Sequence, residues 1–246
     1  MRVRTALTVA GSDSGGGAGI QADLKTFLDR GVFGMSVVTA ITAQNTTAVR
    51  AVSLVGPDMV REQLRAVFDD LPVDAMKTGM LADAATVDAV CDVLEALSHR
   101  PMLVVDPVML AKDGSALYDP KALDALKSRL FPLATLVTPN IPEAKALGVL
   151  TVPTLLKGGH GSGPFVSDEL RVGGKSRRWH HPRTDTKNTH GTGCTLSAAI
   201  TAELAKGEAL ETACATSLNY VAALVRGATE SLGSGHGPLL HGLRKG

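Results

Sequence analysis

Aromatic residues are scarce in this chain of 246 residues, which has one Trp, two Tyr and five Phe. Charge of one sign is not in excess either, because 25 Lys and Arg face 24 Asp and Glu for a formal net charge of +1. Nucleic-acid-binding surfaces normally need a basic patch, often with aromatic rings for stacking. The composition therefore excludes an extended nucleic-acid interface and indicates a small-molecule partner.

Cysteine and long apolar runs are also rare. The three cysteines, Cys91, Cys194 and Cys214, are far apart in sequence and form no Cys-x-x-Cys pair. This usage fits a reducing compartment better than a disulfide framework. No window approaches the roughly 18 uninterrupted apolar residues of a membrane span. The apolar residues 1–10 are interrupted by two arginines and end at a glycine-rich loop, which leaves no signal-peptide core. We expect a soluble cytoplasmic protein.

Several common catalytic motifs are missing. The chain has no Gly-x-x-x-x-Gly-Lys-Ser/Thr loop and no Gly-x-Ser-x-Gly elbow, which excludes an ordinary P-loop nucleotidase and the simplest serine hydrolase. The glycine loop at 11–19 lacks the spacing of a dinucleotide fingerprint. His160, His180 and His181 do not form a zinc pattern, since adjacent residues of an extended segment point to opposite sides.

What the sequence does contain is a regular alternation of short apolar strands and amphipathic helices. This alternation predicts one α/β domain over residues 1–246, with a mostly parallel sheet covered by helices on both faces. A hairpin is expected in 158–184. The predicted strands are 6–10, 36–43, 49–55, 75–78, 102–105, 135–138 and 153–157, and the predicted helices are 19–29, 58–68, 83–97, 120–130, 191–206 and 210–230.

Polar and glycine residues follow six of these strands. In open α/β sheets, ligands bind beyond the carboxyl ends of the strands, so we expect one site there. Turn residues are needed at strand ends in any case, and only the set as a whole is informative. The six segments are 11–13, 44–45, 77–80, 106–109, 138–140 and 157–160.

The turn at 188–194 opens directly onto an apolar helix. The first amides of a helix have no intrahelical acceptor and lie at the positive end of its dipole, where phosphate oxygens bind. The same field can stabilise a thiolate, which makes Cys194 a candidate base or anion contact. The alternative is an ordinary helix start with turn glycines and a buried thiol.

Two carboxylates and a lysine fit phosphoryl transfer, which depends on charge neutralisation and positioning. Asp106 and Glu143 could hold a magnesium ion directly or through water. Glu143 is equally well explained as a first-turn acid of a short helix that begins near Pro142. Lys157 could reach phosphate oxygens, and Lys112 and Lys187 are further candidates.

A second group of residues suits a flat heterocycle. Gln44 can donate and accept at once, as a ring with an amino group and a ring nitrogen requires. Asp23 could accept from an amino or hydroxymethyl group, although an exposed first-turn acid is the simpler explanation. Met80 and Val108 could cover the ring faces or belong to the core.

Taken together, these segments resemble the hydroxymethylpyrimidine/phosphomethylpyrimidine kinases of thiamine biosynthesis, members of the ribokinase-like superfamily. The similarity covers about residues 5–205 and keeps the family order of motifs. The matching segments are 10–26, 39–46, 77–81, 106–109, 138–144, 157–160 and 186–198.

The resemblance implies ATP-dependent phosphorylation of 4-amino-5-hydroxymethyl-2-methylpyrimidine, and then of its monophosphate, at one site in a homodimer. Cys194 would take the hydroxyl proton in the first step, and Mg²⁺ would be held by Asp106 and Glu143. The remaining positions fall into three groups: the pyrimidine pocket at Gly11, Asp23, Gln44, Met80 and Val108; the anion hole at Gly191, Thr192, Gly193 and Cys194; and the nucleotide contacts at Asn140, Lys157 and Thr186.

The segment 144–156 departs from the family pattern. Only 13 residues separate Glu143 from Lys157, where the family usually places another helix. We expect altered packing on the nucleotide side or at an oligomer contact. Pyridoxal kinase activity and a non-catalytic pyrimidine-binding module remain as alternatives.

Overall fold

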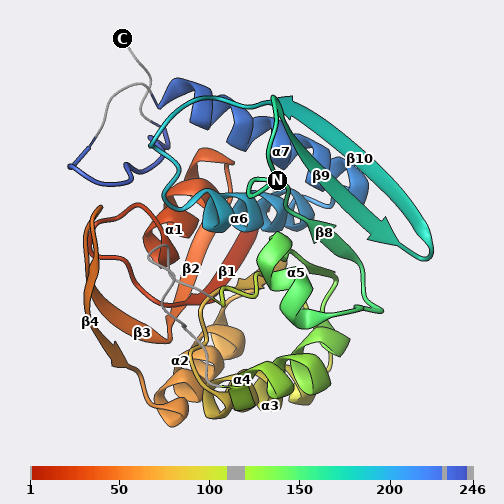
Figure 1. The fold of residues 1–246 in the computed structure, drawn as a ribbon. Coiled ribbons are helices and arrows are strands. Elements are labelled where there is room, and N and C mark those ends of the chain that lie inside the picture. The colour runs from red at the N-terminus through yellow and green to blue at the C-terminus, as the bar shows by residue number, and fades with distance from the viewer. Residues whose placement is uncertain (1, 110–119, 229–231, 243–246) are drawn as a thin grey trace.

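The computed structural model describes residues 2–109, 120–228 and 232–242. Its centre is an eight-stranded sheet in the order β10-β9-β8-β7-β6-β5-β1-β2 (Figure 1). Six strands are parallel, and the hairpin predicted in 158–184 is confirmed as β9–β10, which joins the sheet antiparallel at one edge. The strands of the sheet are β1 (Thr5–Ala10), β2 (Phe33–Val38), β5 (Ala75–Thr78), β6 (Met102–Val105), β7 (Leu136–Val137), β8 (Thr154–Leu156), β9 (Phe165–Val172) and β10 (Lys175–Pro182).

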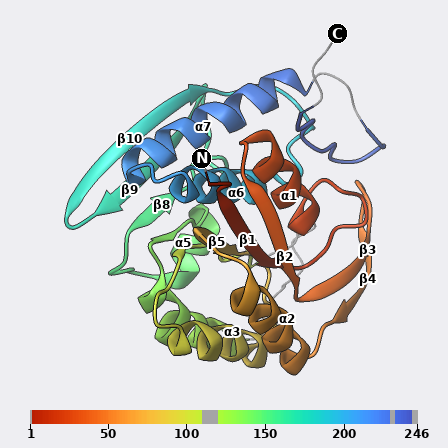
Figure 2. The ribbon, with the colours of Figure 1, turned by 180° about the vertical axis from the view of Figure 1, so that it is seen from behind.

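Helices cover both faces of this sheet, which confirms the predicted α/β class (Figures 1 and 2). One face carries α1 (Gly19–Asp29), α6 (Thr192–Ala205) and α7 (Leu210–Gly227). The other carries α2 (Pro57–Asp70), α3 (Ala84–Ala96), α4 (Pro120–Ala125) and α5 (Ile141–Leu147). A wider helical turn, Leu126–Leu130, and a short 3-10 turn, Phe131–Leu133, continue α4. The predicted last helix, 210–230, extends at its end into residues outside those described.

Helix α6 positions the site because it runs through the interior. Every residue of α6 from Thr195 to Ala205 is buried, and most of them are small or aliphatic. Small side chains let the helix lie close to the sheet on one side and to α1 and α7 on the other. Its amino terminus therefore opens at the carboxyl edge of the parallel strands. None of the described helices is long and apolar enough to cross a bilayer.

The predicted strand 36–43 is wrong in one respect, because it is two strands that belong to different sheets. β2 ends at Val38, the chain bends at Thr39, and β3 (Ala40–Gln44) pairs with β4 (Val49–Leu54) in a separate two-stranded sheet. Thr39 fixes the bend, since its amide donates to the Ala10 carbonyl (3.0 Å) and its hydroxyl to the Met80 carbonyl (2.7 Å). We call β3, β4 and their connecting turn 45–48 the flap. Gln44 thus lies on the flap and does not follow a strand of the main sheet.

The short segment before β8 forms no helix. α5 ends at Leu147 and β8 begins at Thr154, and the structure describes every residue between them. Leu150 and Val152 of this connection pack against the core on the α2–α5 side. Beyond β8 the β9–β10 hairpin is exposed over much of its length.

Candidate active site

A cavity of about 990 Å³ lies at the carboxyl ends of the parallel strands, bounded by the flap, the amino terminus of α6 and part of α7. This is the edge at which the sequence places its polar segments. Most of the predicted site residues line it, and they come from seven different strand ends, loops and helix starts. These residues are Gly11, Gln44, Met80, Asp106, Val108, Asn140, Glu143, Lys157, Gly191, Thr192, Gly193 and Cys194.

The turn before α6 has the geometry of an anion-binding helix start. Gly191 is the N-cap and has φ of 76°, and α6 begins at Thr192. A Cβ at Gly191 would overlap the Gly17 carbonyl, so only glycine allows this turn to lie against the loop after β1. The amides that follow Gly191 face the cavity end of the helix, where a phosphate group would be stabilised.

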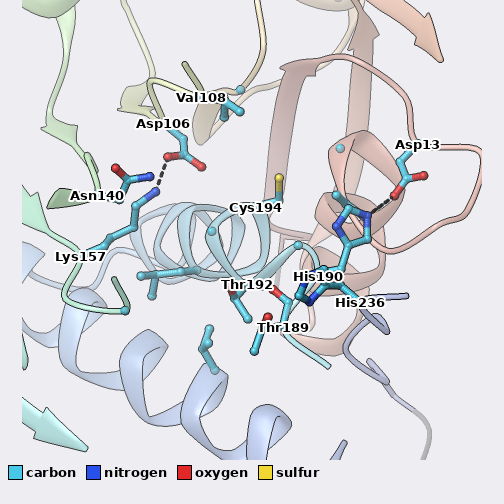
Figure 3. A pocket seen from close by; sticks show the side chains of 18 of the residues that line it. Asp13, Asp106, Val108, Asn140, Lys157, Thr189, His190, Thr192, Cys194 and His236 are labelled. Carbon is cyan, nitrogen blue, oxygen red and sulfur yellow. Dashed lines mark hydrogen bonds and ion pairs between the residues drawn. The ribbon is translucent and has the colours of Figure 1, made fainter. Parts of the chain in front are cut away.

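The Cys194 side chain lies between two pairs of side chains, Asp106 with Lys157 at one end of the cavity and Asp13 with His190 at the other (Figure 3). It is partly exposed, whereas Cys91 and Cys214 are buried. Burial raises the pKa of the Cys194 thiol to about 11, although the Lys77 charge and the Gly19 amide oppose the rise. The start of α6 therefore does not bring the pKa of this thiol below its ordinary value, and the role of Cys194 as a base stays a prediction.

Lys157 and Asp106 form an ion pair in the cavity wall. Lys157 Nζ lies 2.6 Å from Asp106 Oδ1, and the Thr138 hydroxyl donates to the same oxygen at 3.2 Å. Burial alone would lower the pKa of Lys157, but the charges of Asp106 and Glu143 raise it. The amine consequently stays protonated, and it is available as a cation for phosphate oxygens.

Glu143 serves as a helix cap and also faces the charged pair. Its Oε2 accepts from the Asn140 amide (2.7 Å), while Asn140 Oδ1 accepts from the Glu143 amide (2.8 Å), forming a capping box at the start of α5. Burial and the nearby Asp106 charge raise the pKa of Glu143. The capping explanation is confirmed, and the proximity to Asp106 leaves the metal prediction open.

The two carboxylates of Asp106 and Glu143 suit a metal ion that takes few protein ligands. No group of three or more His, Cys, Asp or Glu side chains with metal-binding geometry occurs among the described residues. Magnesium usually keeps several waters and binds through one or two carboxylates plus substrate phosphates. Asp106 and Glu143 fit that mode of binding.

The predicted apolar residues Met80 and Val108 line the cavity. The Met80 methyl packs on Gly11, where an added Cβ would come within 2.8 Å of Met80 Cε. Val108 faces the cavity above Cys194 (Figure 3). Gln44 Nε2 lies 3.3 Å from His190 Nε2, so the flap contacts the turn before α6.

Asp23 lies behind this pocket and does not line it. It is fully buried, and its two oxygens are bound by the Thr8 hydroxyl (2.7 Å) and Lys77 Nζ (2.8 Å). Burial raises the pKa of Asp23 despite the opposing Lys77 charge. A direct contact between Asp23 and substrate stays a prediction.

Three other predicted contacts lie away from the cavity or outside the described residues. Thr186 accepts from the Asn188 amide (3.1 Å) and does not line the cavity, and Lys187 is exposed on the same loop. Lys112 falls outside the residues that the structure describes. The role of Thr186 in nucleotide binding stays a prediction.

Two residues that the sequence argument left without a role organise the loops of the site. Asp13 Oδ2 accepts from the amides of Gly17 (3.1 Å) and Ala18 (2.8 Å) and lies 2.8 Å from His190 Nε2. Burial would raise the pKa of Asp13, but His190 and the loop amides hold it below its usual value. The sequence offered one signal for this role of Asp13, an acidic residue within a glycine-rich loop, because such a side chain can accept hydrogen bonds from the amides of its own loop.

Comparison with known proteins identifies the family. The model of the family described as phosphomethylpyrimidine kinase matches residues 13–154 and 149–240. This chain belongs to that family. The two matches meet in the segment where the expected helix is missing, and each carries part of the site.

Individual relatives agree with this assignment. A hydroxymethylpyrimidine/phosphomethylpyrimidine kinase of Bacillus subtilis is 42% identical over 98% of this chain and 96% of its own length. A thiamine biosynthesis bifunctional protein of Geobacter sulfurreducens is 49% identical over 96% of this chain, which spans about half (51%) of that longer protein. Among solved structures, an ADP complex of Bacillus subtilis pyridoxal kinase superposes with a TM-score of 0.88 at 35% identity and covers 98% of both chains.

Proposed function

We propose that this protein transfers the γ-phosphoryl group of ATP to 4-amino-5-hydroxymethyl-2-methylpyrimidine and then to the resulting monophosphate. The observation that carries the proposal is the position of Cys194. Its side chain lies at the start of α6, between a Lys157–Asp106 pair that suits phosphates and the Met80, Val108 and Gln44 side chains that suit a heterocycle. The names of the family relatives support the same reaction.

In the first transfer, the acceptor hydroxyl oxygen forms a bond to the γ-phosphorus while the bond from that phosphorus to the bridging oxygen breaks and ADP leaves. The hydroxyl proton goes to the Cys194 thiolate, acting as general base. The Gly191–Cys194 amides and Lys157 stabilise the charge that develops on the transferred group. Mg²⁺, held by Asp106 and Glu143 directly or through water, would neutralise charge on the nucleotide phosphates.

The second transfer differs at one point. The nucleophile is a phosphate oxygen that is already ionised, so no proton has to be removed. Cys194 then matters less as a base, and the anion hole and Lys157 matter more.

The nucleotide would lie on the side of Asn140, Lys157 and Thr186. The similarity to the ADP complex of a pyridoxal kinase supports nucleotide binding by this fold. Val166 of β9 and Val221 of α7 line the cavity beyond Lys157 and would offer apolar surface to the base.

We also propose that the protein is a cytoplasmic homodimer. The flap exposes Ile41 (60%), which lies on the opposite face of β3 from its neighbour Thr42 in the cavity wall. A second copy of the flap could bury Ile41. Light scattering after gel filtration tests the dimer, and Ile41→Glu should shift a dimer to monomer.

The reaction is tested by incubating purified protein with ATP, Mg²⁺ and the hydroxymethylpyrimidine, followed by mass-resolved chromatography. We expect the monophosphate first and the diphosphate later. Absence of ADP release with either acceptor would contradict the proposal. Calorimetric binding of the pyrimidine without turnover would instead indicate a non-catalytic binding module.

Pyridoxal phosphorylation is the second candidate, because the superposed pyridoxal kinase covers nearly the whole chain. Comparison of kcat/KM for pyridoxal and for the hydroxymethylpyrimidine decides between them. We expect the pyrimidine to be preferred, because Gln44 can pair with both an amino group and a ring nitrogen.

A further inference from the structure

A glycine-rich segment near the carboxyl terminus contacts three loops of the site at once. Residues 233–238, here called the strap, contain glycine at 233, 235 and 237 and end at Pro238. Their contacts reach the turn of the flap, the turn before α6 and the glycine loop after β1. The reaction proposed above assigns no role to this segment.

The strap binds the turn of the flap through backbone hydrogen bonds. The His236 amide donates to the Thr46 carbonyl at 3.0 Å, and the Gly235 amide donates to the Thr46 hydroxyl at 3.3 Å. A Cβ at Gly235 would overlap the Thr46 carbonyl oxygen. The approach of the two backbones therefore requires glycine at 235.

The same segment binds the turn before α6. The His190 amide donates to the Gly237 carbonyl at 3.1 Å, and His190 and Pro238 form a parallel β-bridge. His236 Nδ1 lies 3.3 Å from the Lys187 carbonyl oxygen, and its side chain lines the cavity beside His190 (Figure 3).

The third contact is with the glycine loop after β1. Pro238 and the His190 ring both pack on Gly17, where an added Cβ would come within 2.8 Å of Pro238 Cβ. Beyond the strap, Leu239 is buried, and His241 Nε2 lies 2.9 Å from the Thr195 hydroxyl of α6. These two contacts anchor the far end of the strap to the helix that carries Cys194.

We propose that the strap is a positioning element of the active site, which holds the flap and the turn before α6 at a fixed separation. Gln44 lies two residues before Thr46, and Cys194 lies four residues after His190. By binding Thr46 and His190 together, the strap sets the distance between the acceptor-binding flap and the anion hole. The acceptor is the hydroxymethylpyrimidine named under the proposed function. The identity of this substrate rests on that proposed function, whereas the contacts of the strap do not depend on it.

The first measurement is amide hydrogen exchange in the free protein, which needs no substrate. Gly235→Ala should raise exchange rates in residues 44–48 and 187–194 by about tenfold or more, because the strap can no longer reach Thr46. Gly227→Ala is the matched control, since nothing lies within 4 Å of a Cβ at that position and it does not line the cavity. We expect it to leave these rates unchanged.

The second measurement is calorimetric binding of the hydroxymethylpyrimidine and of ADP, each alone. Gly235→Ala should raise the Kd of the pyrimidine about tenfold while the Kd of ADP changes less than about twofold, a difference of roughly one decade in affinity. Unchanged exchange in 44–48 and 187–194, or equal weakening of both ligands, would overturn the proposal. If Gly235→Ala does not fold, Thr46→Ala, which removes the hydroxyl acceptor without adding bulk, is judged by the same two criteria with a smaller expected effect of about threefold.

These results separate the strap from the reaction. Wild-type protein that shows no phosphoryl transfer contradicts the proposed function, whereas the exchange data still decide the role of the strap. Conversely, if the wild-type protein is active and amide exchange in Gly235→Ala is unaltered, the proposed function stands and the proposed role of the strap is wrong.

Discussion

Lys157 and Asp106 are paired across strand β7, with 2.6 Å between Nζ and Oδ1. Asp106 follows β6 and Lys157 follows β8, so the pair joins two strand ends that are not neighbours in the sheet. Asp106 is almost fully buried, and Lys157 is 14% exposed toward the cavity. In the proposed reaction, the cation would thus be held in place before a phosphate arrives, which avoids a reorganisation cost during transfer.

Lys157→Met should lower kcat for phosphoryl transfer by about 10²-fold or more, as loss of a charge-stabilising donor usually does. It should also lower the free energy of unfolding by about 3 kcal/mol, because Asp106 would keep a buried charge without its partner. Steady-state kinetics and urea unfolding measure the two effects. Lys145→Met on the exposed side of α5 is the control, and similar losses in both variants would refute a specific role.

Cys194→Ala should slow the first phosphorylation much more than the second, because only the first removes a hydroxyl proton. Burial places the pKa of the thiol at about 11. Below that value the thiolate fraction rises about tenfold per pH unit. In the wild type, kcat/KM for the hydroxymethyl substrate should therefore increase from pH 7 to pH 9, with a flatter profile for the monophosphate. Equal losses in both steps on substitution would mean that the thiol serves the anion hole and not proton transfer.

Alkylation by iodoacetamide should modify Cys194 alone in the native protein, since Cys91 and Cys214 are buried. The rate should be slow at pH 7 and should rise with pH, because the thiolate is the reactive form. Mass spectrometry of peptides identifies the site, and bound pyrimidine should protect it. Rapid modification at pH 7 would show that the thiol is already ionised.

Lys77→Met should destabilise the fold by about 3–5 kcal/mol, because it leaves Asp23 buried without a cation. The pKa of Asp23 is already raised by burial and rises further in the variant. A carboxyl whose folded pKa exceeds the unfolded value binds its proton more tightly in the folded state, so stability falls as pH rises through that range. Urea unfolding should show a larger loss at pH 8 than at pH 5. An equal loss at both values would mean that Asp23 does not titrate between them.

Helix and strand positions were largely predictable because burial on one or both faces leaves a periodic pattern. The bend at Thr39 was not, since residues 36–43 are equally β-forming before and after it. What redirects β3 is a pair of hydrogen bonds to Ala10 and Met80, which are far from Thr39 in sequence. These tertiary hydrogen bonds of Thr39 direct the chain into β3, and the position of Gln44 on the flap was therefore not predictable from the local sequence.

The site was predictable where residues follow strands of the parallel sheet, as Asp106 and Lys157 do. The partners of charged residues that lie within a helix or strand were harder to predict. Lys77 lies within a buried strand, and a lysine there needs an acidic partner, but no local pattern shows that the partner is Asp23 of α1. The pKa of Cys194 also depends on burial that only the packing around α6 reveals.

Within the described part of the chain, β10 is the last strand of the sheet, and one row of its backbone groups has no neighbouring strand. An open row of this kind can recruit a strand from another molecule and so begin aggregation. Lys175, Arg177 and Arg178 place positive charge along β10, and the strand ends at Pro182, which has no amide hydrogen to donate. Like charges would meet if two such edges approached each other. The exposed hairpin can therefore form the edge of the sheet without becoming a point of self-association.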